Sequence, residues 1–225
     1  LLRKGRIKER GKRMKGLLIK DLCNLRQIAK QTLIVLAVLA AWCLFLNNSQ
    51  IFSMMMIIYC MMLIFTAMSY DEMANFDKYA LTLPVTRRDL VKTKYALLLI
   101  LFAVGILVGL LGEGVFYLTR GGGGIFLTEH AISLFSVACL YLMAFAVLMP
   151  FIFRLGMEKA RLLLALIFVI AFGVIYGGVI LVRNMGIEIT DQLVAGVIAA
   201  GLVLAVAGFF LSYLISVNIV QKKEW

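Results

Sequence analysis

Residues 69–95, SYDEMANFDKYALTLPVTRRDLVKTKY, form the one long polar passage between the apolar runs of this chain. Three parts follow one another in it: an acidic and aromatic part, a short apolar elbow at residues 81–84, and a basic part that enters the next apolar run. A plain tether between two helices needs neither aromatic side chains nor charges sorted by sign. We therefore interpret the passage as a docking surface on the cytoplasmic side of a membrane protein.

The amino-acid composition also indicates a membrane protein. The chain has 225 residues, of which 63% are hydrophobic and 16% charged, whereas a soluble domain is about half apolar and about a quarter charged. Its apolar runs approach the ~20 residues that a helix needs to cross a ~30 Å hydrocarbon core. The sequence thus predicts an all-α, polytopic membrane protein whose surroundings are the lipid bilayer.

Six transmembrane helices are predicted, and together residues 32–225 are expected to form one six-span domain. The first span is short, so we expect it to extend into residues 28–31. Four polar residues, 47–50, leave room only for a tight hairpin between the first two spans. The predicted spans cover residues 32–46, 51–68, 95–118, 131–153, 162–182 and 193–215.

The basic residues predict the topology, because loops that stay in the cytoplasm carry an excess of lysine and arginine. With six alternating spans, all but two of the 23 basic residues fall on one side, the exceptions being Arg120 and Arg183. Both termini and the passage at 69–95 lie on this basic side. We therefore expect them to be cytoplasmic.

The N-terminal region has two parts. In residues 14–31, Leu18, Leu22, Leu25 and Ala29 recur at three- and four-residue spacing, which predicts an amphipathic helix. We expect this helix to lie in the headgroup plane; a plain extension of the first span is the alternative. Residues 1–13 form a basic leader without aromatic residues, so nucleic acid is not an expected partner. Because a conventional start follows at Met14, we expect this leader not to be native.

No catalytic, cofactor or metal site is predicted. The sequence lacks the phosphate loop GxxxxGK[ST] and the motifs HExxH and GxSxG, so the chain is not expected to be an enzyme or to hydrolyse ATP by itself. Glu113 stands out among the spans. It lies ~27 Å along the helix from Tyr95, near the outer boundary of the membrane. There the Glu113 carboxylate either forms part of an outer gate or substrate path or is simply solvated.

The whole of residues 14–225 resembles the membrane (permease) subunit of type-two ABC exporters, in particular the compact permeases of Gram-positive bacteria. The resemblance rests on the start MKGLLIKDL at 14–22, on three pieces of the polar passage, and on the closing LSYLISVNIVQKKE at 211–224. The three pieces are YDE at 70–72, FDKY at 76–79 and LPVTR at 83–87.

The resemblance implies a multi-pass protein of the bacterial cell membrane, an ABC ATPase subunit that binds ATP-Mg, and a second permease subunit in a homo- or heterodimer. Residues 69–95 would contain the coupling helix between spans two and three. A stand-alone membrane protein without an ATPase, such as a channel-like pore or a toxin-immunity factor, is the alternative. The residues expected to dock the ATPase are Asp71, Glu72, Phe76, Asp77, Tyr79, Leu81, Leu83, Pro84, Arg87 and Arg88.

Overall fold

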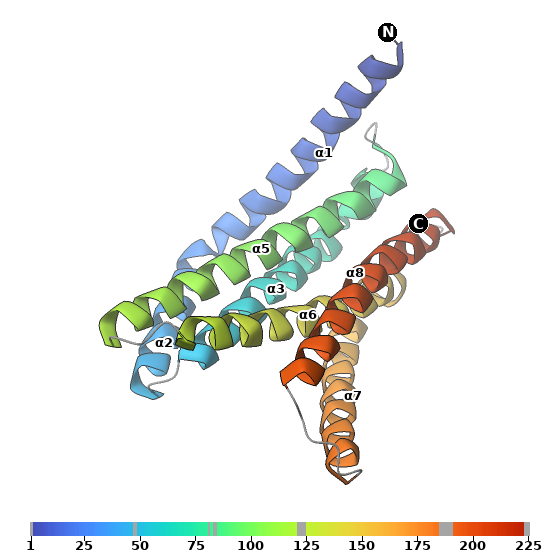
Figure 1. Cartoon of the computed structure of the whole chain (residues 1–225). Coiled ribbons are helices and arrows are strands. Elements are labelled where there is room, and N and C mark those ends of the chain that lie inside the picture. Colours follow the sequence, from blue (N-terminus) through green and yellow to red (C-terminus); the bar gives the residue numbers. More distant parts are fainter. Residues whose placement is uncertain are drawn as a thin grey trace. The chain divides into compact units, whose positions relative to one another are not determined.

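The computed structural model describes residues 2–46, 49–80, 82, 85–120, 125–184 and 191–222, and the regular structure in these ranges is entirely α-helical (Figure 1). Its helices are α1 (Leu2–Gln27), α2 (Ala29–Leu46), α3 (Ser49–Met73), α4 (Phe76–Ala80), α5 (Arg87–Arg120), α6 (Ile125–Leu155), α7 (Met157–Asn184) and α8 (Asp191–Lys222).

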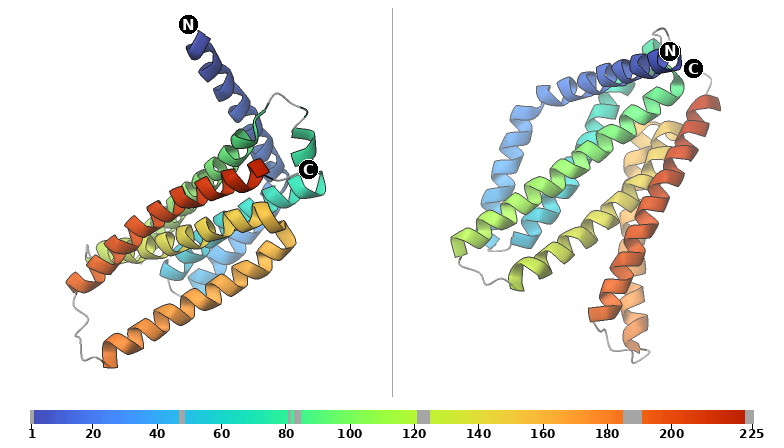
Figure 2. Two further views of the ribbon diagram at one scale, coloured as in Figure 1. Left: turned by 90° about the vertical axis from the view of Figure 1, so that its right-hand side faces the viewer. Right: turned by 45° about the horizontal axis from the view of Figure 1, so that its top comes forward.

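Five helices carry a segment that is long and apolar enough to cross a membrane: α3, α5, α6, α7 and α8. They confirm the second to sixth predicted spans. The helix α2 covers the first predicted span and is short, as expected; it reaches membrane length only together with α1. The bend where these two helices meet measures 61°. The right-hand view of Figure 2 shows α1 turning into α2 at this point. The predicted fold, an all-helical polytopic membrane protein, is confirmed.

The chain divides into two units, one formed by residues 1–138 with 220–225, the other by residues 139–219. In the first unit α3 and α5 run side by side and share the most extensive helix contact, while α1 and α2 pack against them (Figure 1). Met56 and Met61 of α3 are fully buried in this contact region. These two methionines of the second predicted span therefore serve packing, which suits their flexible side chains, whereas Met55 is 45% exposed.

Glycines on one face of α5 allow this close approach. A Cβ at Gly105 would lie 3.1 Å from the Cα of Ile57, and a Cβ at Gly112 would overlap the ring of Phe52. Between them, the Ser53 hydroxyl donates to the carbonyl oxygen of Gly109 at 3.2 Å. Small residues bring two helix backbones together in lipid, where no hydrophobic force does so. The glycines at the GxxxG spacing of residues 105–109 thus form a helix contact within the chain, between α5 and α3.

In the second unit α6 and α7 are joined by one residue, Gly156, whose φ is 85°. A residue in this left-handed region ends a helix, and glycine adopts it without a steric penalty. The amide of Gly156 still donates to the carbonyl oxygen of Ile152 at 3.0 Å. A single glycine therefore ends α6 and lets α7 begin at once.

A proline interrupts the hydrogen bonding of α6. Pro150 has no N–H, so the carbonyl of Ala146, four residues earlier, loses its partner within the helix. The hydroxyl of Ser212 on α8 donates to this carbonyl oxygen. In a span surrounded by lipid, such replacement by a serine of a neighbouring helix is how a proline becomes tolerable.

Candidate functional site

The predicted docking passage begins inside the last turn of α3 and is turned away from that helix at Asn75. Asn75 has a φ of 47°, in the left-handed region that asparagine tolerates better than most residues. Its amide donates to the carbonyl oxygen of Glu72 at 3.1 Å, which closes the end of α3. The short helix α4 starts at the next residue, Phe76.

The passage enters α5 through a capping box. The Thr86 hydroxyl and the Asp89 carboxylate are 2.6 Å apart, the Thr86 amide donates to this carboxylate at 3.3 Å, and the Asp89 amide donates to the Thr86 hydroxyl at 3.3 Å. This reciprocal arrangement satisfies amides that the first turn of a helix leaves without partners. It fixes where the span begins.

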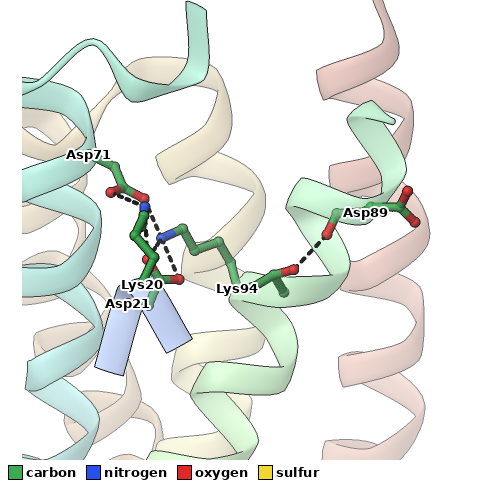
Figure 3. Close-up of polar contacts among 6 residues, drawn as sticks. Lys20, Asp21, Asp71, Asp89 and Lys94 are labelled. Carbon is green, nitrogen blue, oxygen red and sulfur yellow. Dashed lines mark hydrogen bonds and ion pairs between the residues drawn. The ribbon is translucent and has the colours of Figure 1, made fainter. Parts of the chain in front are cut away.

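Four charged side chains meet between these two ends and form what we call the charge ring: Lys20 and Asp21 of α1, Asp71 of α3, and Lys94 of α5 (Figure 3). The Lys20 ammonium lies 2.5 Å from Asp71 and 3.0 Å from Asp21. The Lys94 ammonium lies 2.9 Å from Asp21 and also contacts Asp71. Each charge thus touches two charges of opposite sign, and the ring is neutral as a whole.

Three of the four side chains of the charge ring are buried, and that of Lys20 is 27% exposed. The Asp21 side chain is 1% exposed and the Lys94 side chain 11% exposed. Taking such charges out of water is costly, and only close pairing with good geometry offsets the cost. The three helices are therefore held in one relative arrangement, because any shift that opens the ring leaves a buried charge without its counterion.

The helix α4 is attached to this ring through Phe76. The Lys20 ammonium lies 3.5 Å from the centroid of the Phe76 ring, a cation–π contact. The Phe76 ring in turn packs at a tilt against Tyr79, with 6.2 Å between centroids. Phe76 is half-buried, whereas Tyr79 is 60% exposed. One aromatic side chain of α4 thus faces the protein and the other faces outward.

The protein-facing side of α1 overlaps the predicted apolar stripe only in part, and the expected position of this helix in the headgroup plane stays a prediction. Leu17, Asp21 and Leu25 are buried, while Leu22, assigned to the apolar stripe, is exposed. Of the predicted stripe only Leu25 is buried, and Leu18 is half-buried. The protein-facing side of α1 therefore carries a charge of the ring between two leucines.

The predicted docking residues occupy several different environments. Asp71 is an internal member of the charge ring and not an exposed contact, because its carboxylate is buried between two lysines. Glu72, Tyr79 and Arg88 are exposed. The side chain of Asp77, and Leu81, Leu83 and Pro84 altogether, lie outside the described residues.

Arg87 contacts the end of another helix. Its guanidinium donates to the carbonyl oxygens of Gln221 at 2.8 Å and of Val220 at 3.4 Å. These carbonyls belong to the last turn of α8, where carbonyl oxygens have no N–H donor within the helix and carry partial negative charge. Arg87 therefore has a structural role within the chain.

Glu113 is half-buried on α5, directly after Gly112. The helix runs without a break from Arg87 to Arg120, so the distance expected between Tyr95 and Glu113 holds. A role as an outer gate or in a substrate path stays a prediction.

Sequence reasoning missed three groups of this site. The amphipathic pattern places Lys20 among the polar positions of the helix and gives Asp21 no role, and Lys94 counts only among the basic residues that lead into the third span. The signal for Asp21 is its place between Leu17 and Leu25 at four-residue spacing, on a face that packs against protein. The capping box is also readable, since Thr-Arg-Arg-Asp has the threonine and the acidic residue at the required spacing.

Comparison with protein families finds a match to the family described as "ABC-2 family transporter protein", over residues 16–221. Comparison with curated proteins and with solved structures finds no match. The family match covers far more than half of the chain, including the charge ring, α4 and all the membrane-length helices. The chain therefore belongs to the ABC-2 transporter family, as a multi-pass permease of the cell membrane.

Proposed function

We propose that this permease is the membrane subunit of an ATP-driven exporter and that a separate ATPase docks on α4 and the residues flanking it. ATP and Mg²⁺ would bind to that partner, since this chain has no phosphate loop. The observation that carries the proposal is the pair of aromatic residues on α4: Phe76 attached to the charge ring, and Tyr79 exposed.

The exposed surface around α4 has the composition of a small protein interface. Met73 and Tyr79 expose large apolar side chains at the end of a span, beside the charged Glu72. Tyrosine and methionine are enriched in interfaces, and a central aromatic anchor with charged neighbours is a common arrangement. The predicted topology places this surface in the cytoplasm, where an ATPase would be.

The inner side of α4 supports a coupling role. A displacement of α4 would act on Lys20 through Phe76, and Lys20 contacts both acidic residues of the charge ring. Since the ring holds α1, α3 and α5 together, movement of a docked ATPase would reach two spans and the N-terminal helix at once. This is a short physical path from a surface helix to the spans.

The exporter is expected to contain a second permease, either a copy of this chain or a sister subunit. Gly105, Gly109 and Gly112 of α5 are already packed against α3, so these three would not form the contact between two permeases. Cross-linking in native membranes, with the ATPase present, tests this: a strictly monomeric permease would contradict the expectation.

Docking is tested with Tyr79→Ala. Truncation of an aromatic anchor commonly weakens binding by about 2 kcal/mol or more, which is a factor of about thirty. The measurement is the affinity of the co-expressed ATPase for the purified permease, together with ATP-driven export. Tyr176→Ala is the matched control, because Tyr176 is 63% exposed on a membrane span and should not touch the ATPase.

If Tyr79→Ala binds the ATPase as the unaltered chain does, docking on α4 is wrong. If the permease in native membranes retains no ATPase at all while the substrate still crosses, the stand-alone pore gains support and the exporter assignment fails.

A further inference from the structure

We propose that a groove between α6 and α8 binds an anionic membrane lipid, with one acyl chain in the groove and the lipid phosphate at Arg154. The site lies wholly within the second unit of the chain. It is separate from the docking surface, so the inference holds whether or not α4 binds an ATPase.

The groove has a volume of about 360 Å³, near the lower end of the range for sites that hold small molecules. All but two of its lining residues are apolar, and the walls include Val147 and Phe151 of α6 and Leu204 and Leu211 of α8. The exceptions are Ser212 and Arg154. A long apolar occupant with one charged end matches this lining.

The groove wall contains no unpaired backbone carbonyl at the position that Pro150 affects. Pro150 releases the carbonyl of Ala146, and the Ser212 hydroxyl donates to that oxygen. Without this hydrogen bond, an acyl chain lying against the Ala146 carbonyl would shield it from water, and burying the unpaired oxygen would cost free energy. With the carbonyl satisfied, the wall accepts a hydrocarbon chain.

Arg154 supplies the charge complementarity. It is exposed at one end of the groove, and it forms no ion pair within the part of the chain that the structure describes. A guanidinium binds a phosphate with two parallel hydrogen bonds, and this makes arginine a preferred phosphate ligand. The predicted topology puts Arg154 at the cytoplasmic leaflet, whose anionic lipids attract basic residues.

The length of the groove fits one leaflet. Its lining on α6 extends from Met143 to Arg154, which is about 17 Å at a rise of ~1.5 Å per residue. Half of a ~30 Å hydrocarbon core is ~15 Å. A lipid whose phosphate sits at Arg154 would therefore place its acyl chain along the whole groove without leaving its own leaflet.

Gly208 provides room on the α8 side. A Cβ built at Gly208 has no neighbour within 4 Å, although this glycine lines the groove. Since its Cβ would meet no neighbour, a leucine at this position is expected to occupy the groove. Gly201 on the same helix is equally open but does not line the groove, so it serves as a matched control.

The test uses the purified full chain, stripped of lipid in detergent and offered phosphatidylglycerol or phosphatidylcholine with identical acyl chains. Native mass spectrometry counts the lipids that remain bound. We expect one phosphatidylglycerol per chain, preferred about fivefold over phosphatidylcholine, the factor that one basic residue contributes near anionic lipid. Gly208→Leu should lose the bound lipid, and Gly201→Leu should keep it.

Arg154→Gln should keep acyl-chain binding but lose the preference for phosphatidylglycerol; it alters no packed residue, so it tests the headgroup contact even if a glycine variant fails to fold. The proposal is overturned if Gly208→Leu retains lipid like the unaltered chain, or if Arg154→Gln keeps the fivefold preference. Retention of an exported amphiphile in place of phosphatidylglycerol would also overturn it and would make the groove part of the substrate path.

Discussion

Replacing Lys94 by methionine should destabilise the first unit strongly, because it removes one of the two cations of the charge ring. Asp21 and Asp71 would then share Lys20 alone, with the Asp21 side chain 1% exposed and the Asp71 side chain 8% exposed. The Lys94–Asp21 attraction at 2.9 Å amounts to about 6 kcal/mol at an effective dielectric constant of ~20. Part of this is offset by the desolvation of Lys94, so we expect a net loss of about 3–5 kcal/mol.

Thermal unfolding of the purified permease measures this loss. At about 2–4 °C per kcal/mol for a chain of this size, the midpoint for Lys94→Met should fall by at least about 6 °C. Lys92→Met is the matched control, because Lys92 is exposed on the same helix and outside the charge ring. Its midpoint should stay within a degree or two of that of the unaltered chain.

A second substitution distinguishes the electrostatic contribution to the stability loss from the packing contribution. Asp21→Asn in the Lys94→Met background restores equal numbers of positive and negative charges, so the double variant should recover a good part of the lost stability. If Lys94→Met unfolds at the same temperature as Lys92→Met, the charge ring does not hold the helices. If the double variant is less stable than Lys94→Met, the loss comes from packing and the electrostatic reasoning is wrong.

Two further predictions concern other parts of the chain. Ser212→Ala should cost about 1–3 kcal/mol, because it leaves the Ala146 carbonyl without a donor; in a Pro150→Ala background, where the helix supplies its own donor, the same change should be nearly neutral in thermal unfolding. In a cysteine-free chain, a cysteine at Asn75 should be protected from an impermeant thiol reagent in intact cells, whereas one within residues 121–124 should react. External labelling at Asn75 would invert the predicted topology.

The membrane-length helices were predictable from the sequence because the bilayer imposes a simple requirement. A span must form its backbone hydrogen bonds within the helix and present apolar side chains for about 20 residues. Long apolar runs in the sequence therefore identify the spans directly. The first span is less clear for the same reason: α2 is short, and its membrane length depends on α1, from which it is bent by 61°.

The register of α1 was not predictable from periodicity. Leu17 with Leu25 and Leu18 with Leu22 form two neighbouring leucine stripes on one helix. At a membrane surface one stripe can face protein and the other lipid, so hydrophobic spacing alone does not decide which stripe contacts the protein. The structure turns Leu17 and Leu25 inward, and Asp21 follows because it lies between them.

The charge ring was also beyond sequence reasoning, since its members come from three helices far apart in the chain. Lys20 meets Asp71 across 51 positions and Lys94 meets Asp21 across 73. Charges near a span are ordinarily taken as solvated ends of the helix, and apart from the place of Asp21 between Leu17 and Leu25 no local feature distinguishes these four. Only the packing of α1 against α3 and α5 makes them partners.

The strengths of these contacts suggest how α4 would respond to a docked partner. The cation–π contact of Phe76 with Lys20 is worth about 0.5–2 kcal/mol, less than the about 3–5 kcal/mol that breaking a buried ion pair costs. Under load we therefore expect Phe76 to slip from Lys20 before the charge ring opens. Phe76→Leu should accordingly weaken coupling between ATP hydrolysis and export while leaving the thermal unfolding midpoint nearly unchanged, and a large fall in that midpoint would show that Phe76 belongs to the structural core instead.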